Sequence, residues 1–450
     1  MTKKKWVLLL LFSALLFGYI KLFYKTFNEE AVAKSADCVI LLDVKRITNT
    51  LIWNFVTTPE LWNTGNFFNN SAAKEINWKD MLEIPDYVQG FHVKNQPANI
   101  WYVVLKVKDE TDFNKGLQQY NFNKINSNEY VSTATGIHIF KNGNKILLAN
   151  TVAESNNYLS DVADEIFIKK LYLPKEKLLK AIAAKSHAVI YIAANKFLQK
   201  DGIITGNFDN NKIEINSTLT PNKQYGFTES SFSFASNSLC TSGFTQPSPE
   251  VYNLLSNNIK KESSKALSIN IDSVLLPDNK QYNLDIQEIK SRVDSAITYT
   301  YDDDFNKLEK VVANNIQEPA FKFTVLGDSV TFIYNHWLRT NKIDQTDTGQ
   351  LFVAIPFVKS YCALKNEKEL NITAENYKLQ QTDKTINCVL FLNILLNKIP
   401  ADLLKYLPKN LINAIANIKS IHLEANKKNE QLTINCILQK KNNSLPVLKL

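Results

Sequence analysis

The sequence predicts an α+β protein, with an N-terminal transmembrane helix followed by two related units, each an antiparallel sheet covered by helices. Three observations predict this class: an apolar N-terminal run, two matching strand–turn–strand segments, and more hairpins than strand–helix–strand crossovers. The expected organisation is an anchor at 1–25, a first unit at 36–245, a linker at 246–261 and a second unit at 262–450.

The anchor is expected from an uncharged, largely apolar run at Trp6–Ile20 that follows the basic residues Lys3–Lys5. If Lys21 snorkels, the run continues to Tyr24 and reaches roughly 28 Å of helix, close to the ~30 Å hydrocarbon core. The lysines predict a single-pass protein of the inner (cytoplasmic) membrane, with its N-terminus in the cytoplasm and its bulk periplasmic or extracytoplasmic. The alternative is a cleaved signal peptide ending at Ala31–Ala33, although charged residues separate this site from the apolar run.

The first unit opens with the strand-like segment Cys38–Asp43, and the second with Leu267–Asp272, both ending in aspartate. Further along, Ala188–Ile192 in the first unit parallels Cys388–Leu392 in the second. The matching segments occur in the same order in the two units, which indicates an internal repeat.

The repeat closes with two segments that align without gaps, Ile203–Thr220 and His422–Gln439. Identities include Asn207 with Asn426 and Ile215 with Ile434. Each segment reads as a strand, an Asn-rich turn and a second alternating strand, which predicts two β-hairpins.

Periodicity and turn residues predict the remaining elements. These are a strand at Ile100–Leu105, a helix near Asp109–Gln119, a hairpin at Ile137–Ala149, a helix at Lys175–Ala184, a hairpin at Phe321–Tyr334 around Gly327-Asp328, and a helical region at Ile399–Ile418.

The composition argues against two classes of partner. The net charge of +8 comes almost entirely from lysine, since the chain has only three arginines, Arg46, Arg292 and Arg339. Base and phosphate recognition relies on the arginine fork, so no nucleic-acid partner is expected. With 12 glycines and no glycine-rich phosphate loop, the sequence predicts no nucleotide and no other cofactor.

No catalytic, cofactor-binding or metal-binding residues are predicted, so we do not expect an enzyme. His92, His138, His187, His336 and His422 are isolated and lack ligand spacing. Three weaker patterns are better explained as chance or solvated loops. They are Ser71–Lys74, Asp302–Asp304, and the group of Asp344, Asp347 and Gly349.

The five cysteines, at 38, 240, 362, 388 and 436, contain no CxxC pair. Three of them lie inside apolar strand-like runs, where a free thiol behaves as a small hydrophobic group. Buried, unreactive thiols are therefore expected, with a disulfide as the alternative.

Several segments resemble uncharacterised single-pass, membrane-anchored periplasmic proteins of Bacteroidetes-type bacteria. The resemblance rests on Val39–Asp43, Leu51–Trp53, Glu60–Trp62 and the closing segment Ile421–Leu450. It implies a location and a repeated architecture, and no activity.

Two functions lead, and a third, an unrecognised hydrolase whose active site is assembled from distant residues, also remains open. The first is non-enzymatic binding of a partner, or scaffolding, in the cell envelope by a membrane-tethered protein. The alternative is a carrier for a lipid or another apolar ligand, because sheets covered by helices can enclose an apolar cavity.

Overall fold

The protein is built mostly from antiparallel β-strands, and its few helices are short. The computed structural model describes residues 23–441, except 58–75, 151–155, 210, 255–259, 262–263, 266–268, 277, 302–304, 348, 356–357, 380–381, 383, 401–411 and 413–415. The predicted α+β class is therefore wrong. Strand pairing, part of it between segments far apart in the sequence, dominates the fold, and local periodicity does not report such pairing.

The predicted transmembrane helix, signal-anchor and inner-membrane location are also corrected. Among the described residues, no helix has both the length and the apolar character needed to span a bilayer. Most of the expected anchor, residues 1–22, lies outside the described part of the chain. Ala31–Ala33, the alternative cleavage site, is buried in a hydrophobic core, and Ala33 bridges to Tyr172.

The described residues form two compact units, one before Pro221 and one from Pro221 to Lys441. In unit 1 the strands lie in the order β5–β6–β7–β8–β4–β3–β1–β9–β10–β11, and every neighbouring pair is antiparallel. A short strand, β2 (Leu82–Glu83), pairs with the end of β4. The bounds are β1 Ala36–Asp43, β3 Tyr87–Val93, β4 Tyr102–Val107, β5 Asn123–Lys124, β6 Glu129–Ser132, β7 Ile137–Asn142, β8 Lys145–Ala149, β9 Ala188–Ile192, β10 Gly202–Phe208 and β11 Lys212–Leu219.

Unit 2 repeats this arrangement in the order β16–β17–β18–β19–β15–β14–β13–β21–β22–β23, again antiparallel throughout. The bounds are β13 Cys240–Thr245, β14 Asn279–Tyr301, β15 Lys307–Gly327, β16 Ile343–Thr346, β17 Gly349–Phe352, β18 Ser360–Asn366, β19 Glu369–Ala374, β21 Leu390–Ile394, β22 Ile418–Lys428 and β23 Gln431–Lys440.

The two units share their strand register as well as their strand order. On β1, Ile40 pairs with Gly90 and Ile190; on β13, Ser242 pairs with Leu284 and Leu392. The strand equivalent to β1 is thus β13, and not the segment Leu267–Asp272. The described end of that segment, Ile271 and Asp272, belongs to a 3-10 turn, η5 (Ile271–Ser273).

Both hairpins predicted from the sequence match form, and they have the same register. Gly206 pairs with Ile215 across β10 and β11, and Ala425 pairs with Ile434 across β22 and β23. The matching residues therefore occupy equivalent places in the two units.

The equivalence extends to one helix in each unit. Helix α4 (Glu110–Gln119) follows β4, and helix α9 (Val330–Arg339) follows β15. Each ends before an asparagine with positive φ, Asn121 and Asn341, because asparagine tolerates the left-handed conformation that reverses the chain after a helix. The hairpin expected at Phe321–Tyr334 is wrong, since the chain turns from β15 into α9.

Helices cover both faces of the sheet in unit 1. On β8, Leu147 and Ala149 pack with α5 (Asn156–Ala163) and α6 (Lys175–Ala183), which are joined by a π-helical turn, η4 (Asp164–Ile168). Ile146 and Leu148, which alternate with them, pack on the opposite face with α4 and α3 (Trp78–Met81). Alternate residues of a strand face opposite sides, so the two clusters lie on the two faces.

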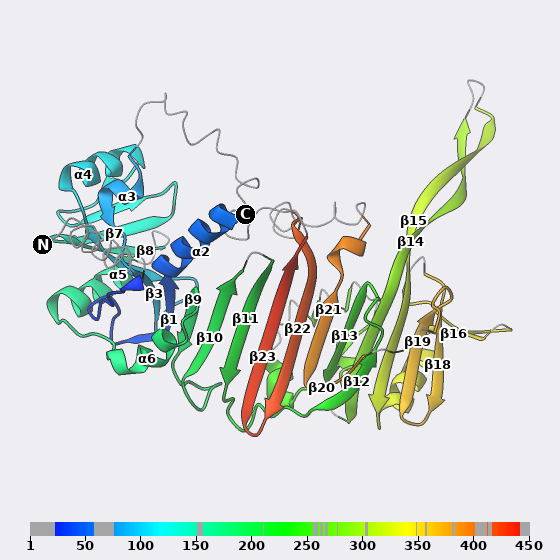
Figure 1. The fold of residues 1–450 in the computed structure, drawn as a ribbon. Helices are drawn as coiled ribbons and strands as arrows, with labels where there is room; N and C mark the ends of the chain where they lie inside the picture. Colours follow the sequence, from blue (N-terminus) through cyan, green and yellow to red (C-terminus); the bar gives the residue numbers. More distant parts are fainter. Residues whose placement is uncertain are drawn as a thin grey trace, which may run out of the picture. The chain divides into compact units, whose positions relative to one another are not determined.

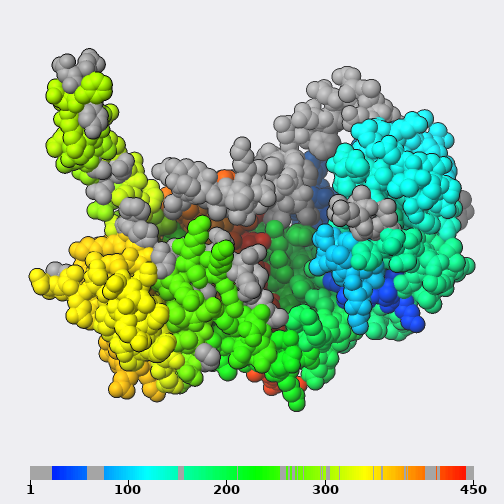
Figure 2. Space-filling view, turned by 180° about the vertical axis from the view of Figure 1, so that it is seen from behind, coloured from blue at the N-terminus to red at the C-terminus, as the bar shows by residue number. Residues whose placement is uncertain are grey.

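Unit 2 is covered differently. Helix α9 packs on β14, β15, β18 and β19. A second cluster joins Phe232, Phe234, Cys388 and Phe391. It is supplied largely by a separate two-stranded sheet of β12 (Ser230–Phe234) and β20 (Lys384–Cys388). The hairpin of β14 and β15 extends well beyond its neighbouring strands as a two-stranded ribbon (Figures 1 and 2).

The remaining predictions of secondary structure are confirmed in part. The strand, helix and hairpin predictions that correspond to β4, α4, β7–β8 and α6 are confirmed. Within the expected linker, Pro249–Leu254 forms helix α7. The region expected to be helical at Ile399–Ile418 lies largely outside the described residues; its end, Ile418, begins β22.

Candidate functional site

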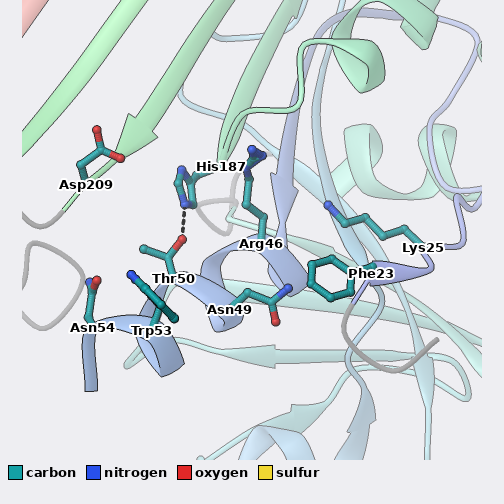
Figure 3. Close-up of a pocket in the computed structure, with 9 residues that line it drawn as sticks. All are labelled: Phe23, Lys25, Arg46, Asn49, Thr50, Trp53, Asn54, His187 and Asp209. Carbon is teal, nitrogen blue, oxygen red and sulfur yellow. Dashed lines mark hydrogen bonds between the residues drawn. The ribbon is translucent and has the colours of Figure 1, made fainter. Parts of the chain in front are cut away.

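Unit 1 contains an open polar pocket of about 620 Å³ (Figure 3). One wall comes from helix α2 (Val44–Thr57), which directly follows β1. The opposite side carries His187, just before β9, and Asp209, just after β10. The lining consists of Phe23, Lys25, Arg46, Asn49, Thr50, Trp53, Asn54, His187 and Asp209.

The α2 wall is a helical stripe. Arg46, Asn49, Thr50, Trp53 and Asn54 recur at spacings of three and four residues, which brings them to one side of a helix. This mixed polar and aromatic stripe is visible in the sequence, but nothing in the sequence indicates that the stripe faces a pocket. The pocket is therefore not among the sequence predictions.

The start of α2 is held by Asp43, the last residue of β1. Its carboxylate accepts a hydrogen bond from the backbone N–H of Arg46 at 2.9 Å, the geometry of an N-cap. The same carboxylate, which is buried, forms an ion pair with Lys25. A strand that ends in aspartate therefore positions the helix that lines the pocket.

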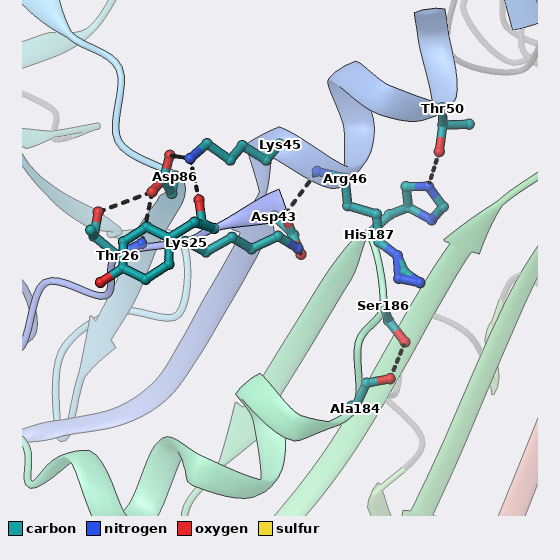
Figure 4. A network of polar contacts seen from close by, with 11 residues as sticks. Lys25, Thr26, Asp43, Lys45, Arg46, Thr50, Asp86, Ala184, Ser186 and His187 are labelled. Carbon is teal, nitrogen blue, oxygen red and sulfur yellow. Dashed lines mark hydrogen bonds and ion pairs between the residues drawn. The ribbon is translucent and has the colours of Figure 1, made fainter. Parts of the chain in front are cut away.

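A second ion pair lies beside the first (Figure 4). Lys45 Nζ lies 3.0 Å from Asp86, whose other oxygen accepts hydrogen bonds from the backbone and hydroxyl of Thr26. Although burial alone would raise the pKa of Asp86, these hydrogen bonds and the charge of Lys45 hold it below its usual value. Lys25 and Lys45 each have a carboxylate partner.

His187 is neutral and its tautomer is set by its neighbours. Its Nδ1 accepts a hydrogen bond from the backbone N–H of Phe208 at 3.2 Å, so its proton is on Nε2 and is donated to the Thr50 hydroxyl at 2.6 Å. Burial lowers the pKa of His187, and the positive charge of Arg46 lowers it further.

Arg46 differs from these groups. Within the described part of the chain, its partly buried guanidinium has no ion pair and no hydrogen bond, whereas Arg292 contacts Glu318 and Arg339 contacts the carbonyl of Asn335. In Figure 3 the Arg46 side chain reaches toward His187. The exposed Trp53 indole lies further along the same stripe.

Unit 2 has a hollow of about 650 Å³ at the equivalent place. The backbone N–H of Asp43 donates to the carbonyl of His187, and the N–H of Thr245 donates to that of Val389, both at 2.9 Å. By this equivalence Val389 stands in place of His187. Residues 246–248, which follow β13, are not helical, so Arg46 of α2 has no helical counterpart there, and Glu229, Lys280 and Lys427 line the hollow instead.

Unit 2 also contains an apolar cavity of about 330 Å³, whose lining is entirely apolar. It lies between the sheet and the segments that cover it, with Trp337 of α9 and Phe352 of β17 fully buried in its wall. The lining residues are Ile269, Val274, Leu284, Ile286, Pro319, Phe321, Phe323, Trp337, Phe352, Ile355 and Ile372.

The wall of this cavity is specific to unit 2. Leu284 and Ile286 of β14 are equivalent in register to Gly90 and His92 of β3. In unit 1 the His92 ring lies 2.6 Å from the carboxylate of Asp37, a polar contact where unit 2 is apolar. The Nε1–H group of Trp337 is buried, and the described residues provide no acceptor for it.

The sequence candidates are dispersed. His187 lies in the unit 1 pocket, His138 is buried in β7, and His336 and His422 belong to α9 and β22. Asp344 and Gly349 belong to the β16–β17 hairpin. Ser71–Lys74 and Asp302–Asp304 lie outside the described residues. No group of three or more potential metal ligands occurs among the residues that the structure describes.

Comparison with known proteins found no matching family model, no matching curated protein and no matching solved structure. The resemblance to membrane-anchored periplasmic proteins therefore stays a prediction.

Proposed function

We propose that unit 2 binds a small apolar molecule in the cavity beneath α9. The observation that carries this proposal is the wholly apolar lining of a space of about 330 Å³, a volume at the lower end of the range for small-molecule sites. An ordinary core fills such a space with side chains, because an empty cavity destabilises the fold. A bound apolar ligand would replace the missing contacts.

The chemistry of the wall narrows the class of ligand. Among the described residues no charged side chain lines the cavity, so a buried carboxylate or phosphate would lack a counter-charge and would be strongly disfavoured. A neutral molecule with an apolar body fits best.

Access to the cavity is expected near Ile269 and Ile355, which are only partly buried. Both lie in irregular segments outside the strands of the sheet. A bulky side chain at either position would fill the entrance with little disturbance to the fully buried wall.

The test measures binding of 1-decanol and decanoate to the full chain by isothermal titration calorimetry, with native mass spectrometry to give the stoichiometry. We expect decanol to bind one-to-one and at least about tenfold more tightly than decanoate. Ile355→Trp should weaken decanol binding at least about tenfold by filling the space, whereas Val293→Trp, at an exposed ribbon position, should not. Equal affinity in the two variants, or preference for decanoate, would refute the proposal.

Partner binding is a second candidate, favoured by the β14–β15 ribbon. Ile297 and Val311 pair across the ribbon, and Val293 and Tyr299 lie on the same face by strand alternation. All four are exposed, Val293 and Val311 by 68% and 67%. An exposed apolar ribbon is a common site of protein association.

The simplest occupant of this ribbon is a second copy, because an exposed apolar face can be buried against the same face of an identical chain. Sedimentation velocity over a concentration series should then show a dimer that Val293→Lys combined with Val311→Lys abolishes. Thr298→Lys, on the other face of the ribbon, is the matched control. A wild-type chain that stays monomeric at about 100 µM would count against this candidate.

A further inference from the structure

We infer that the unit 1 pocket binds a small organic acid. Its acidic group would lie on the Arg46 guanidinium, and its apolar part on the aromatic rings of Trp53 or Phe23. This site is separate from the apolar cavity proposed for unit 2. It rests on the charges of the pocket, on its lining and on the contrast with the equivalent hollow of unit 2.

The ion pairs around the start of α2 are the first support for this inference. Lys25 is paired with Asp43, and Lys45 with Asp86, so the carboxylates nearest the start of α2 already have partners. Arg46 has no such partner among the described residues and is partly removed from water. An anion that reached this guanidinium could form two parallel hydrogen bonds with it, the strongest kind of side-chain recognition of an acid.

The neighbouring groups do not compete for that anion. His187 is neutral, with Nδ1 occupied by the Phe208 backbone and Nε2 by Thr50. The remaining carboxylate of the lining, Asp209, is exposed to water, and no ion pair joins it to Arg46. Solvent screens such a charge, so its repulsion of an anion on Arg46 is weak.

The lining supplies a surface for the rest of the ligand. The Trp53 indole is 67% exposed and lies two helical turns along the stripe from Arg46, which places the two side chains about 10 Å apart along the helix axis. Phe23 adds a second exposed aromatic ring. A planar acid could stack on one of these rings.

The equivalent hollow of unit 2 is built from different residues. Residues 246–248, which follow β13, are not helical, and the charged side chains that line the hollow are Glu229, Lys280 and Lys427. Within the described part of the chain, an arginine on a helix that directly follows the strand is therefore a feature of unit 1.

The test is a ligand-observed NMR titration of the full chain with benzoate, and with benzamide as a neutral molecule of the same shape. We expect benzoate to bind with a millimolar or lower dissociation constant and benzamide at least about tenfold more weakly. Arg46→Gln should raise the benzoate dissociation constant at least about tenfold, and Arg46→Lys should have a smaller effect because it keeps the charge.

Arg292→Gln is the matched control, since it removes one arginine from the β14–β15 ribbon. It should leave benzoate affinity within about twofold of the wild type, and Trp53→Ala should weaken it. Circular dichroism and thermal melting establish that every variant is folded. Equal binding of benzoate and benzamide, or equal losses in Arg46→Gln and Arg292→Gln, would overturn the inference, as would no detectable benzoate binding.

Discussion

The imidazole Nε2 of His187 lies 2.6 Å from the hydroxyl oxygen of Thr50, across the pocket wall formed by α2. Because the backbone N–H of Phe208 occupies the other ring nitrogen, a second proton on this ring would break a hydrogen bond. The contact ties the helix that follows β1 to the turn that precedes β9, and it requires a neutral histidine.

This contact predicts that unit 1 loses stability in mild acid. Burial, then the charge of Arg46, lowers the folded-state pKa of His187 below its ordinary value of about 6.5. The unfolded chain therefore binds more protons as pH falls through and below that value. The stabilisation is complete above the unfolded pKa and is lost on acidification.

Thermal melts at pH 7.5 and pH 5.5 would measure this loss. His187→Gln, which cannot take up a proton, should show a smaller drop in melting temperature between the two conditions than the wild type. A similar drop in both proteins would show that other groups control the pH dependence.

Asp43 is predicted to be important for stability because one buried carboxylate caps α2 and pairs with Lys25. Asp43→Ala should lower the free energy of unfolding by at least about 2 kcal/mol, through the lost cap and the unpaired cation. Asp43→Asn keeps an acceptor for the cap and should cost less. Urea denaturation gives both values, and Asp209→Ala, at an exposed site, should change stability by no more than about 0.5 kcal/mol.

Gly243 of β13 is predicted to be required for aromatic packing. A Cβ atom there would lie 2.5 Å from the rings of Phe232 and Phe391, which are both buried. Gly243→Ala should therefore destabilise the protein by about 1–3 kcal/mol. Gly206→Ala is the control in another strand, where the nearest atom is 3.7 Å away, and it should be nearly neutral. Equal effects in chemical denaturation would contradict the steric explanation.

The thiols are predicted to be unreactive in the folded protein. All five cysteines are free in the structure. Burial raises the pKa of Cys362 and Cys388 to about 12, and that of Cys38 and Cys240 to about 11. Because the thiolate is the reactive form, a disulfide reagent at pH 8 should modify the native chain slowly and the denatured chain rapidly. Rapid native reaction of any thiol would disagree with this burial.

The sequence by itself determined the local elements. The hairpin turn at Gly143 and the helical periodicity of Lys175–Ala183 act between residues close in the chain, so their patterns were sufficient to predict β7–β8 and α6. The match between Ile203–Thr220 and His422–Gln439 likewise identified two equivalent hairpins, because both strands of a hairpin lie in one short segment.

Only the tertiary structure decided which distant segments are neighbours. Residues of β1 pair with residues of β9 far along the chain, and the equivalence of β13 to β1 appears only in that pairing. The same long-range strand order places Arg46 and His187 around one pocket, and Ile269 and Ile372 around the apolar cavity. Pairing between distant strands depends on how the side chains of many strands pack against one another. Local sequence patterns therefore do not predict it.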